Sequence, residues 1–385
     1  MKIKLFSLSL LTFMILSSCS DEVIVENYFY DKEDYDLMSQ YIDIPTSPYD
    51  YTLDFPDYIT SFVRTDVNAN MATLGRVLFY DVNLSSDRSI SCASCHKQEL
   101  AFSDNVAFSK GAGDRSTTRN SLALGSVINF SLYYGDQVFN GIPFFWDNSA
   151  QTIQQQSTRT IANPNEMNMP LHDVVDRVNE LPYYAPLAEK AFGTKTMSET
   201  DVLDAIATFT NAITTYDTKF DKALESTFKT YGTLNGKEKN NFADLTAQEN
   251  AGKNIYMTNC SACHGLLAGR PGKINGNNGL YEVYSDFGEG SYNGNAKFKI
   301  PTLRNILRTA PYMHDGSLAT IDEVLDHYST GIKNTTGLSD ELKSGNQPKN
   351  MYFTEDEREA LKAFFGTMND NEIVNDQRFA DPFKQ

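Results

Sequence analysis

Apolar side chains along the chain recur at helical rather than strand-like intervals. Leu74, Val77 and Leu78 share one face of a helix that we expect from about residue 69, and residues 171–181 and 198–224 carry the same spacing. Strand-like alternation of apolar and polar residues is scarce. The pattern therefore predicts a mainly α protein whose helices pack through one apolar face.

Helix start signals support this prediction. Thr246, Thr320 and Thr354 are each followed three residues later by a glutamate, the capping-box pattern that satisfies the first unpaired amides of a helix. Residues 265–297 are instead rich in glycine and asparagine and predict a long loop, while a domain boundary is expected near residues 231–241.

The chain also contains two related halves. The segment GRVLF at residues 75–79 is echoed by GKNIY at residues 252–256, and the length of the chain allows two domains that each bury a core. The predicted parts are a signal peptide (1–18), a flexible tether (19–50), an N-terminal domain (51–235) and a C-terminal domain (236–385).

The first residues have the order of a lipoprotein signal. Lys2 and Lys4 precede an apolar run over residues 5–16 that is too short to span a bilayer, and Leu-Ser-Ser-Cys follows at residues 16–19. We expect Cys19 to be the lipid-bearing mature N-terminus of a periplasmic or surface lipoprotein in the cell envelope. The alternative is an ordinary export signal followed by an incidental cysteine.

The charge of the chain restricts its partners. The formal net charge is −17, and removal of the signal peptide with its two lysines makes the mature protein more acidic still. This argues against nucleic acid and favours basic or neutral protein partners. No later apolar stretch is long enough to cross a membrane, so membrane contact is expected through the N-terminal lipid only.

The four remaining cysteines form two C-x-x-C-H motifs. This pattern covalently attaches a c-type haem through two thiols and supplies an imidazole for the iron. Zinc or disulfides are the alternatives, but neither explains a histidine after each pair. We therefore expect two c-type haems, held by Cys92, Cys95 and His96 and by Cys260, Cys263 and His264.

Further segments carry a resemblance to a known family. They are SCASCH at residues 91–96, FWD at 145–147, NPNEM at 163–167, PTLRN at 301–305 and APYMHDGS at 310–317. Together with the two haem motifs, they resemble the di-haem bacterial cytochrome c peroxidase/MauG family over residues 70–367. The resemblance implies two cytochrome c-like domains with one haem each and long loops around the cofactors.

The resemblance also implies roles for three side chains. In that family the N-terminal haem binds peroxide, the C-terminal haem stores or relays an electron, and a tryptophan between them matches Trp146. The distal glutamate matches Glu166, which would move protons during peroxide cleavage, and a distal glutamine matches Gln156. The alternatives are a core aromatic at Trp146 and a solvated turn residue at Glu166.

Two positions depart from the better-known peroxidases. Where those enzymes carry a histidine that ligates the N-terminal iron, this chain has Ala112, so we expect the first haem to be open or water-bound. Where they carry a methionine ligand to the second haem, this chain has Tyr328, as MauG-like members do. A phenolate would lower the potential of that haem. Tyr328 shares a helical face with apolar residues and could instead be core, with Met313 and His327 as competing ligands.

The family further holds a calcium ion between its domains. Its asparagine side chain and two backbone carbonyls match Asn120, Thr309 and Pro311, and such oxygen donors suit a hard cation.

These features predict a di-haem cytochrome-c peroxidase that reduces hydrogen peroxide to water. Its electrons would come from a small cytochrome c or a cupredoxin. Two alternatives stay open: a MauG-like, peroxide-dependent oxidase of a partner protein, and a non-enzymatic di-haem electron carrier.

Overall fold

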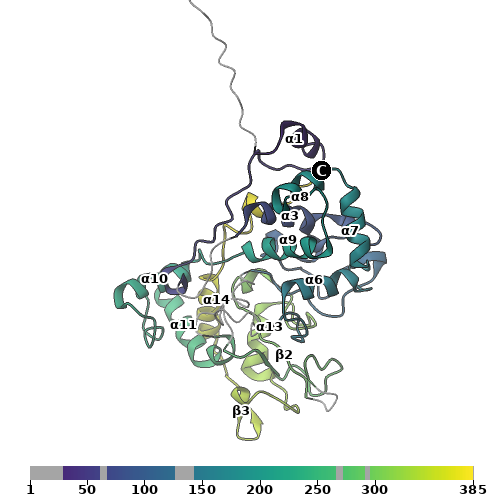
Figure 1. Cartoon of the computed structure of the whole chain (residues 1–385). Coiled ribbons are helices and arrows are strands. Elements are labelled where there is room, and N and C mark those ends of the chain that lie inside the picture. Colours follow the sequence, from purple (N-terminus) through teal and green to yellow (C-terminus); the bar gives the residue numbers. More distant parts are fainter. Residues whose placement is uncertain (1–28, 61–66, 126–142, 266–271, 291–294, 385) are drawn as a thin grey trace, which may run out of the picture.

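The computed structural model describes residues 29–60, 67–125, 143–265, 272–290 and 295–384. These residues form a mainly helical protein, as predicted, and Figure 1 shows the helices in two adjoining lobes. Strands within the described residues are limited to two short antiparallel pairs, β1 (Asn275–Gly276) with β2 (Phe298–Lys299) and β3 (Lys343–Ser344) with β4 (Gln347–Pro348).

The helices follow the order of the two halves. Those of the first half are α1 (Lys32–Met38), α2 (Asp57–Thr60), α3 (Ala69–Tyr80), α4 (Cys92–Cys95), α6 (Ile153–Ala162), α7 (Leu171–Glu180), α8 (Tyr184–Phe192), α9 (Glu199–Ala212) and α10 (Lys219–Tyr231). Those of the second half are α11 (Ala247–Asn259), α12 (Ser261–His264), α13 (Ile321–Asp326), which continues as a π-helix over His327–Gly331, and α14 (Glu355–Gly366).

The predicted helix starts are confirmed. Thr246, Thr320 and Thr354 each form a capping box, in which the threonine hydroxyl accepts from the backbone of the glutamate three residues later. The helical spacing of residues 198–224 belongs to two helices rather than one, because α9 ends at Ala212 and a second capping box at Thr218 starts α10.

A glycine lets the first lobe form its main helix crossing. Helix α3 packs across α9 at Gly75, where a Cβ atom would lie 1.9 Å from the carbonyl oxygen of Ala205. Phe79, one turn further along α3, packs on Phe209 of α9 with ring centroids 5.2 Å apart. The two backbones can therefore approach this closely only with glycine at position 75.

The second lobe repeats this crossing with its own residues. Helix α11 packs across α14 at Gly252, where a Cβ atom would lie 1.8 Å from the carbonyl oxygen of Ala360. Tyr256, one turn further along α11, packs on Phe364 at 5.3 Å. The sequence echo between residues 75–79 and 252–256 thus corresponds to a repeated helix pair, and α3 and α11 are the helices that precede the two haem motifs.

Two segments of the chain cross between the lobes. Residues 53–59 pack with α10 in the core of the second lobe. The C-terminal segment returns to the first lobe, where Phe379 packs in the core and Ile42 pairs with Phe383 beside α1; Figure 1 shows the C-terminus at this place. The division after residue 235 remains a prediction, and side-chain packing crosses it in both directions.

The prediction of a flexible tether is wrong for residues 29–50. Helix α1 lies in this segment, and Tyr30, Met38, Ile42 and Ile44 are buried in the core of the first lobe. Most other residues of the segment are polar or acidic, so its overall composition suggested a disordered chain. The few apolar side chains that pack in the core were not apparent from that composition. Residues 19–28 and the predicted signal peptide lie outside the described residues.

None of the helices in the described ranges is both long and apolar enough to cross a membrane.

The helix crossings predict a specific sensitivity to an added methyl group. Gly252→Ala should lower the free energy of unfolding by about 1–3 kcal/mol, because α11 and α14 must separate to admit the Cβ atom. Urea unfolding of the purified protein measures this change. Gly366→Ala is the matched control, since its Cβ would meet nothing closer than a Leu307 methyl at 3.9 Å. That variant should change stability by less than about 1 kcal/mol. Equal stability of the two variants would contradict the packing argument.

Candidate functional site

The first haem motif is held at the end of a short helix. Ser91 caps α4 in a capping box with Ser94, and His96 follows the helix. The Nδ1 atom of His96 lies 3.0 Å from the carbonyl oxygen of Phe102. A carbonyl can only accept, so Nδ1 carries the proton and Nε2 keeps a free lone pair for a metal. Burial lowers the pKa of His96, which keeps the ring neutral.

The second motif has the same arrangement. Cys260 directly follows α11, and His264 ends α12 with its Nδ1 atom 3.0 Å from the carbonyl oxygen of Pro301. Burial again lowers the pKa of the imidazole. Both motifs therefore present a neutral histidine with Nε2 available. The four cysteines of the motifs are not joined in disulfides in the described structure.

A cavity of about 230 Å³ opens beside the second motif. Its walls are mostly apolar, and they include Cys260, Cys263 and His264. A largely apolar pocket with two thiols and a neutral imidazole fits the covalent attachment and ligation of a c-type haem.

Two of the three candidate ligands for this second site lie on the cavity wall. Tyr328 and Met313 both line the cavity, whereas Nε2 of His327 is engaged with the carbonyl oxygen of Asn278 at 3.0 Å. The Asn278 side chain bonds the Tyr328 phenol and donates to the sulfur of Met313. Asn278, within the loop predicted from glycine and asparagine content, is a site residue that the sequence did not single out.

Tyr328 owes its position to a local departure from α-helical geometry. Helix α13 changes to a π-helix at His327–Gly331, which rotates the following side chains relative to a regular helix. Burial raises the pKa of the Tyr328 phenol above its ordinary value, so the side chain by itself is neutral. Tyr328 therefore lines the cavity and is not only a packed core residue.

Trp146 lies at the cavity of the second motif and is linked to the first motif through residues 120 and 121. Its indole N–H donates to the carbonyl oxygen of Asn120 at 2.8 Å, and its ring lines the cavity of the second motif. The neighbouring Ser121 hydroxyl donates to the carbonyl oxygen of Cys95 and lies 3.3 Å from Nδ1 of His96. Residues 120–121 thus contact Trp146 on one side and the first motif on the other.

An ion-pair network fixes this junction. Arg119 bonds Asp286 through Nε and Nη2, at 2.7 and 2.9 Å, and bonds Asp147 through Nη1 at 2.7 Å. Asp147 is the residue after Trp146, and Asp286 comes from the loop of the second lobe. The network therefore ties the tryptophan segment to both halves of the chain.

The two distal residues expected at the first motif, Gln156 and Glu166, are joined by a side chain that the sequence did not indicate. Gln156 donates to the hydroxyl of Thr160 at 2.9 Å, and Thr160 in turn bonds the Glu166 carboxyl group. Asn163 donates to Glu166 Oε1 at 2.7 Å. Gln156 and Thr160 are four residues apart on α6, a spacing that could have revealed the pair.

Glu166 is a partly buried residue whose carboxyl group lies near the two cysteines of the first motif. Burial raises its pKa, although hydrogen bonds from Thr160 and Asn163 oppose the shift. Burial also raises the pKa of the Cys92 thiol, and the Glu166 charge is near enough to raise it further. The partial burial of Glu166 and its raised pKa favour the distal role over the alternative of a solvated turn residue.

The loop with Ala112 packs directly on the turn that carries Glu166. The Ala112 amide donates to the Glu166 carbonyl oxygen at 2.8 Å, and a Cβ atom on Gly111 would lie 2.1 Å from the carbonyl oxygen of Asn165. The loop therefore supports the turn that carries Glu166, although it supplies no histidine.

The expected calcium residues also meet at the cavity. Asn120, Thr309 and Pro311 all contribute to its wall. The Asn120 amide donates to the carbonyl oxygen of Val106 at 3.1 Å, which directs its Oδ1 to the other side. The three residues offer only neutral oxygens, and no cluster of three or more His, Cys, Asp or Glu side chains suited to a metal occurs in the described residues.

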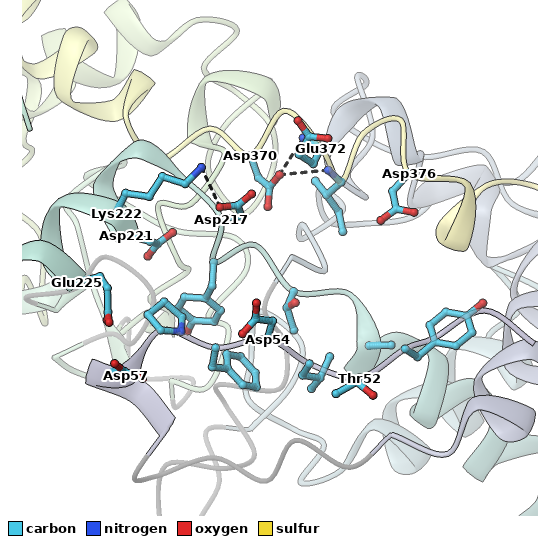
Figure 2. A pocket seen from close by; sticks show the side chains of 18 of the residues that line it. Thr52, Asp54, Asp57, Asp217, Asp221, Lys222, Glu225, Asp370, Glu372 and Asp376 are labelled. Carbon is cyan, nitrogen blue, oxygen red and sulfur yellow. Dashed lines mark hydrogen bonds and ion pairs between the residues drawn. The ribbon is translucent and has the colours of Figure 1, made fainter.

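A second, larger hollow of about 940 Å³ lies away from these residues. Figure 2 shows acidic side chains from residues 54–57, from α10 and its preceding turn, and from residues 370–376 around it. None of the predicted site residues lines it. At its inner end Asp221 makes a buried, bidentate ion pair with Arg304, which lines the haem-motif cavity. Burial alone would raise the pKa of Asp221, but Arg304 brings it below its ordinary value.

Sequence comparisons identify similar proteins. The profile of the family described as di-haem cytochrome c peroxidase matches residues 69–229. The chain is 32% identical to the methylamine utilization protein MauG of Methylorubrum extorquens over 302 residues, which cover 77% of each chain. It is also 32% identical to cytochrome c551 peroxidase of Nitrosomonas europaea over 273 residues, which cover 68% of this chain and 73% of the relative.

Solved structures share the fold. A MauG-like protein associated with microbial copper homeostasis superposes with a TM-score of 0.66 at 27% identity, covering 87% of this chain and 98% of that chain. The diheme peroxidase BthA from Burkholderia thailandensis gives a TM-score of 0.60 at 18% identity, covering 90% of this chain and 99% of that chain.

The environment of Glu166 predicts an effect of pH on stability. Because the folded-state pKa is raised, protonation of Glu166 favours the folded protein, and this stabilisation is complete below the ordinary carboxyl pKa of 4.5. It is lost as the pH rises through the raised value. Glu166→Gln mimics the protonated group, so urea titrations should show the variant gaining stability over the natural protein as the pH approaches neutrality.

The control for this effect is Glu180→Gln, at an exposed position at the end of α7. It should leave the pH dependence of unfolding unchanged. Parallel pH profiles for the natural protein and the Glu166 variant would refute a buried, proton-holding carboxyl group.

Proposed function

The chain belongs to the di-haem cytochrome c peroxidase family and is an oxidoreductase, and we propose that it reduces hydrogen peroxide to water with electrons from a small cytochrome c or a cupredoxin. The observation that carries this proposal is the buried Glu166 carboxyl group beside the first haem motif, joined through Thr160 to Gln156. An electron carrier has no need of a proton-holding group at that position.

Two haems c agree with the family, and we propose their ligands from the geometry of the motifs. Cys92 and Cys95 would attach the first haem and Cys260 and Cys263 the second, with His96 and His264 as the iron ligands. The carbonyl oxygens of Phe102 and Pro301 hold each Nδ1 proton and so direct Nε2 to the metal. When bound, such a haem supplies an iron that exchanges electrons and, with an open face, takes a peroxide oxygen.

Glu166 is proposed to move the protons of the reaction. Burial raises its pKa above the ordinary carboxyl value, which favours a form that can hold and release a proton, and its neutral partners Thr160 and Asn163 keep the carboxyl group in place in either state. It would take a proton from one peroxide oxygen and return it to the other, departing oxygen. Gln156 would bind peroxide or water by hydrogen bonds and orient it.

Trp146 is proposed as the relay for electrons between the two sites. Its ring lines the second cavity, while its N–H bonds the segment that touches His96. The acceptor of that N–H is a backbone carbonyl, which takes up no proton, so the indole would pass an electron without losing its proton. Ala112 supports an open first iron, because its side chain offers no ligand atom.

Tyr328 is proposed as the second ligand of the second haem, in preference to Met313 and His327. Its phenol is on the cavity wall and bonds the Asn278 side chain, whereas Nε2 of His327 is engaged with the backbone carbonyl oxygen of Asn278. We also propose a calcium ion at Asn120, Thr309 and Pro311, which share the cavity wall and would need water ligands to complete the shell.

The location and partners of the protein are proposed from the sequence. Cys19, outside the described residues, would carry a lipid after removal of residues 1–18 and hold the protein in the periplasm or at the cell surface. The net charge of −17 favours a donor protein with a basic surface and association that weakens as salt increases.

A MauG-like function is the second candidate. Here electrons would come from residues of a partner protein instead of a small donor. The tyrosine at the second site and the similarity to MauG of Methylorubrum extorquens favour it. Incubation with peroxide but no donor, followed by mass spectrometry of associated proteins, separates the two candidates: specific oxidation of one partner supports the MauG-like function.

Steady-state assays with peroxide and reduced donor proteins test the main proposal. The haem-loaded protein should turn over without reductive pre-treatment, because Ala112 leaves no histidine to displace. Glu166→Gln should retain both haems but lower turnover by roughly 10²–10⁴-fold, since it cannot transfer the proton.

The control for the turnover assay is Glu180→Gln, which should match the natural protein. Turnover that depends strictly on prior reduction would contradict the open first site. Full activity of the Glu166 variant would remove the proposed proton carrier.

Substitution of Tyr328 tests the ligand of the second haem. Tyr328→Phe keeps the ring but removes the oxygen, so the spectrum of that haem should change. Tyr328→Met, which exchanges an anionic oxygen for a neutral sulfur, should raise its potential, and about 59 mV corresponds to tenfold in a one-electron equilibrium. Redox titration monitored by absorbance measures both effects, with the first haem as internal control. An unchanged Phe variant would leave Tyr328 as a packing residue and make Met313→Leu the next test.

A further inference from the structure

Two adjacent tyrosines at the start of α8 share one buried carboxylate. The phenols of Tyr183 and Tyr184 donate to the same oxygen of Asp81, at 2.8 and 2.7 Å. Asp81 follows α3 and is 1% exposed, and its other oxygen accepts from the backbone and side chain of Asn83. Each phenol therefore has an acceptor that can take its proton.

These tyrosines begin a chain of rings that leads from the first haem motif to the surface. Tyr184 is buried in the same core as Cys92, which is near enough to affect the phenol electrostatically. Its ring centroid lies 4.7 Å from that of Tyr183, which in turn lies 5.4 Å from that of Tyr41. Tyr41 is 42% exposed and so ends the chain in solvent.

Four other buried or partly buried tyrosines lack this combination. Tyr51, Tyr80 and Tyr256 donate to backbone carbonyl oxygens, which do not take up a proton. Tyr58 donates to Asp221, whose carboxylate is held by Arg304. A phenol gives up an electron readily only when its proton can leave at the same time, so those tyrosines are poor steps for an oxidising equivalent.

We propose that Tyr184, Tyr183 and Tyr41 conduct an oxidising equivalent from the first haem site to the surface when no donor protein is bound, with Asp81 taking and returning the phenolic protons. The proposal rests on the proposed peroxidase function, because peroxide supplies the oxidant. The path protects the buried site by directing its oxidation to one exposed side chain.

Electrons and protons balance at each step. Tyr184 gives one electron to the peroxide-oxidised site and its proton to Asp81. Tyr183 then gives one electron to the Tyr184 radical and its own proton to Asp81, while Asp81 returns the first proton to Tyr184. Finally Tyr41 gives one electron to the Tyr183 radical, which recovers its proton from Asp81, and Tyr41 releases a proton to water. The net change is one electron taken from Tyr41, with Asp81 unchanged.

Peptide mass spectrometry of the haem-loaded protein after peroxide treatment without donor tests the path. Tyr41 should be the main site of hydroxylation or dityrosine formation. Oxidation governed by exposure alone would instead favour Tyr352 and Tyr231, which are 68% and 53% exposed. Tyr281, 37% exposed and bonded to Asp315, marks the competing region near the second motif.

Variants separate the path from general oxidation. Tyr183→Phe keeps the ring but interrupts the chain, so oxidation of Tyr41 should fall severalfold, while Tyr231→Phe should leave it unchanged. If Tyr183→Phe does not fold, Tyr41→Phe provides the test: freeze-quench electron paramagnetic resonance should then show a longer-lived tyrosyl radical, because its exit is lost.

The outcomes distinguish the two levels of the proposal. A haem spectrum that does not respond to peroxide would overturn the peroxidase function itself. Two results would overturn the path but leave the peroxidase function standing, provided that the haem spectrum responds to peroxide. One is dominant oxidation of Tyr352, Tyr231 or Tyr281. The other is undiminished oxidation of Tyr41 in the Tyr183→Phe variant.

Discussion

The close helix crossings at Gly75 and Gly252 are the constraint on which both haem sites depend. In each lobe the helix before the haem motif lies against a later helix with no room for a side chain, at Ala205 in one and Ala360 in the other. An aromatic pair one turn further along closes the crossing. Helix α11 runs directly into the second motif, and α3 contacts α4, which carries the first motif. These crossings therefore help to position the cysteines and histidines of both motifs.

The environment of each buried carboxyl group determines what it can do. Asp221 faces the cation of Arg304 and stays ionised, so it contributes structure beside the cavity. Glu166 has neutral partners in a buried setting, and its raised pKa makes it able to exchange a proton. Asp81 accepts hydrogen bonds from two phenols, which is the arrangement that the proposed tyrosine path uses. The same functional group thus serves three purposes because its neighbours differ.

Residues 119–121 connect these parts. Arg119 joins the tryptophan segment to the second lobe, Asn120 receives the indole N–H, and Ser121 contacts the first motif. A short segment therefore connects Trp146 with both sites. This placement suits the electron relay that we propose for the indole.

The sequence by itself determined the local features: the helical class, the capping boxes at Thr246, Thr320 and Thr354, the repeat at residues 75–79 and 252–256, and the two C-x-x-C-H motifs. Each depends on residues close together in the chain, so its physical cause lies within a few positions. Only the tertiary structure revealed that residues 29–50 pack in a core, that Thr160 links Gln156 to Glu166, and that Asn278 engages Tyr328, Met313 and His327. These contacts form between side chains that come close only because of how the helices cross and where the loops run. No local pattern encodes such proximity, because burial and partner choice are decided when distant segments meet.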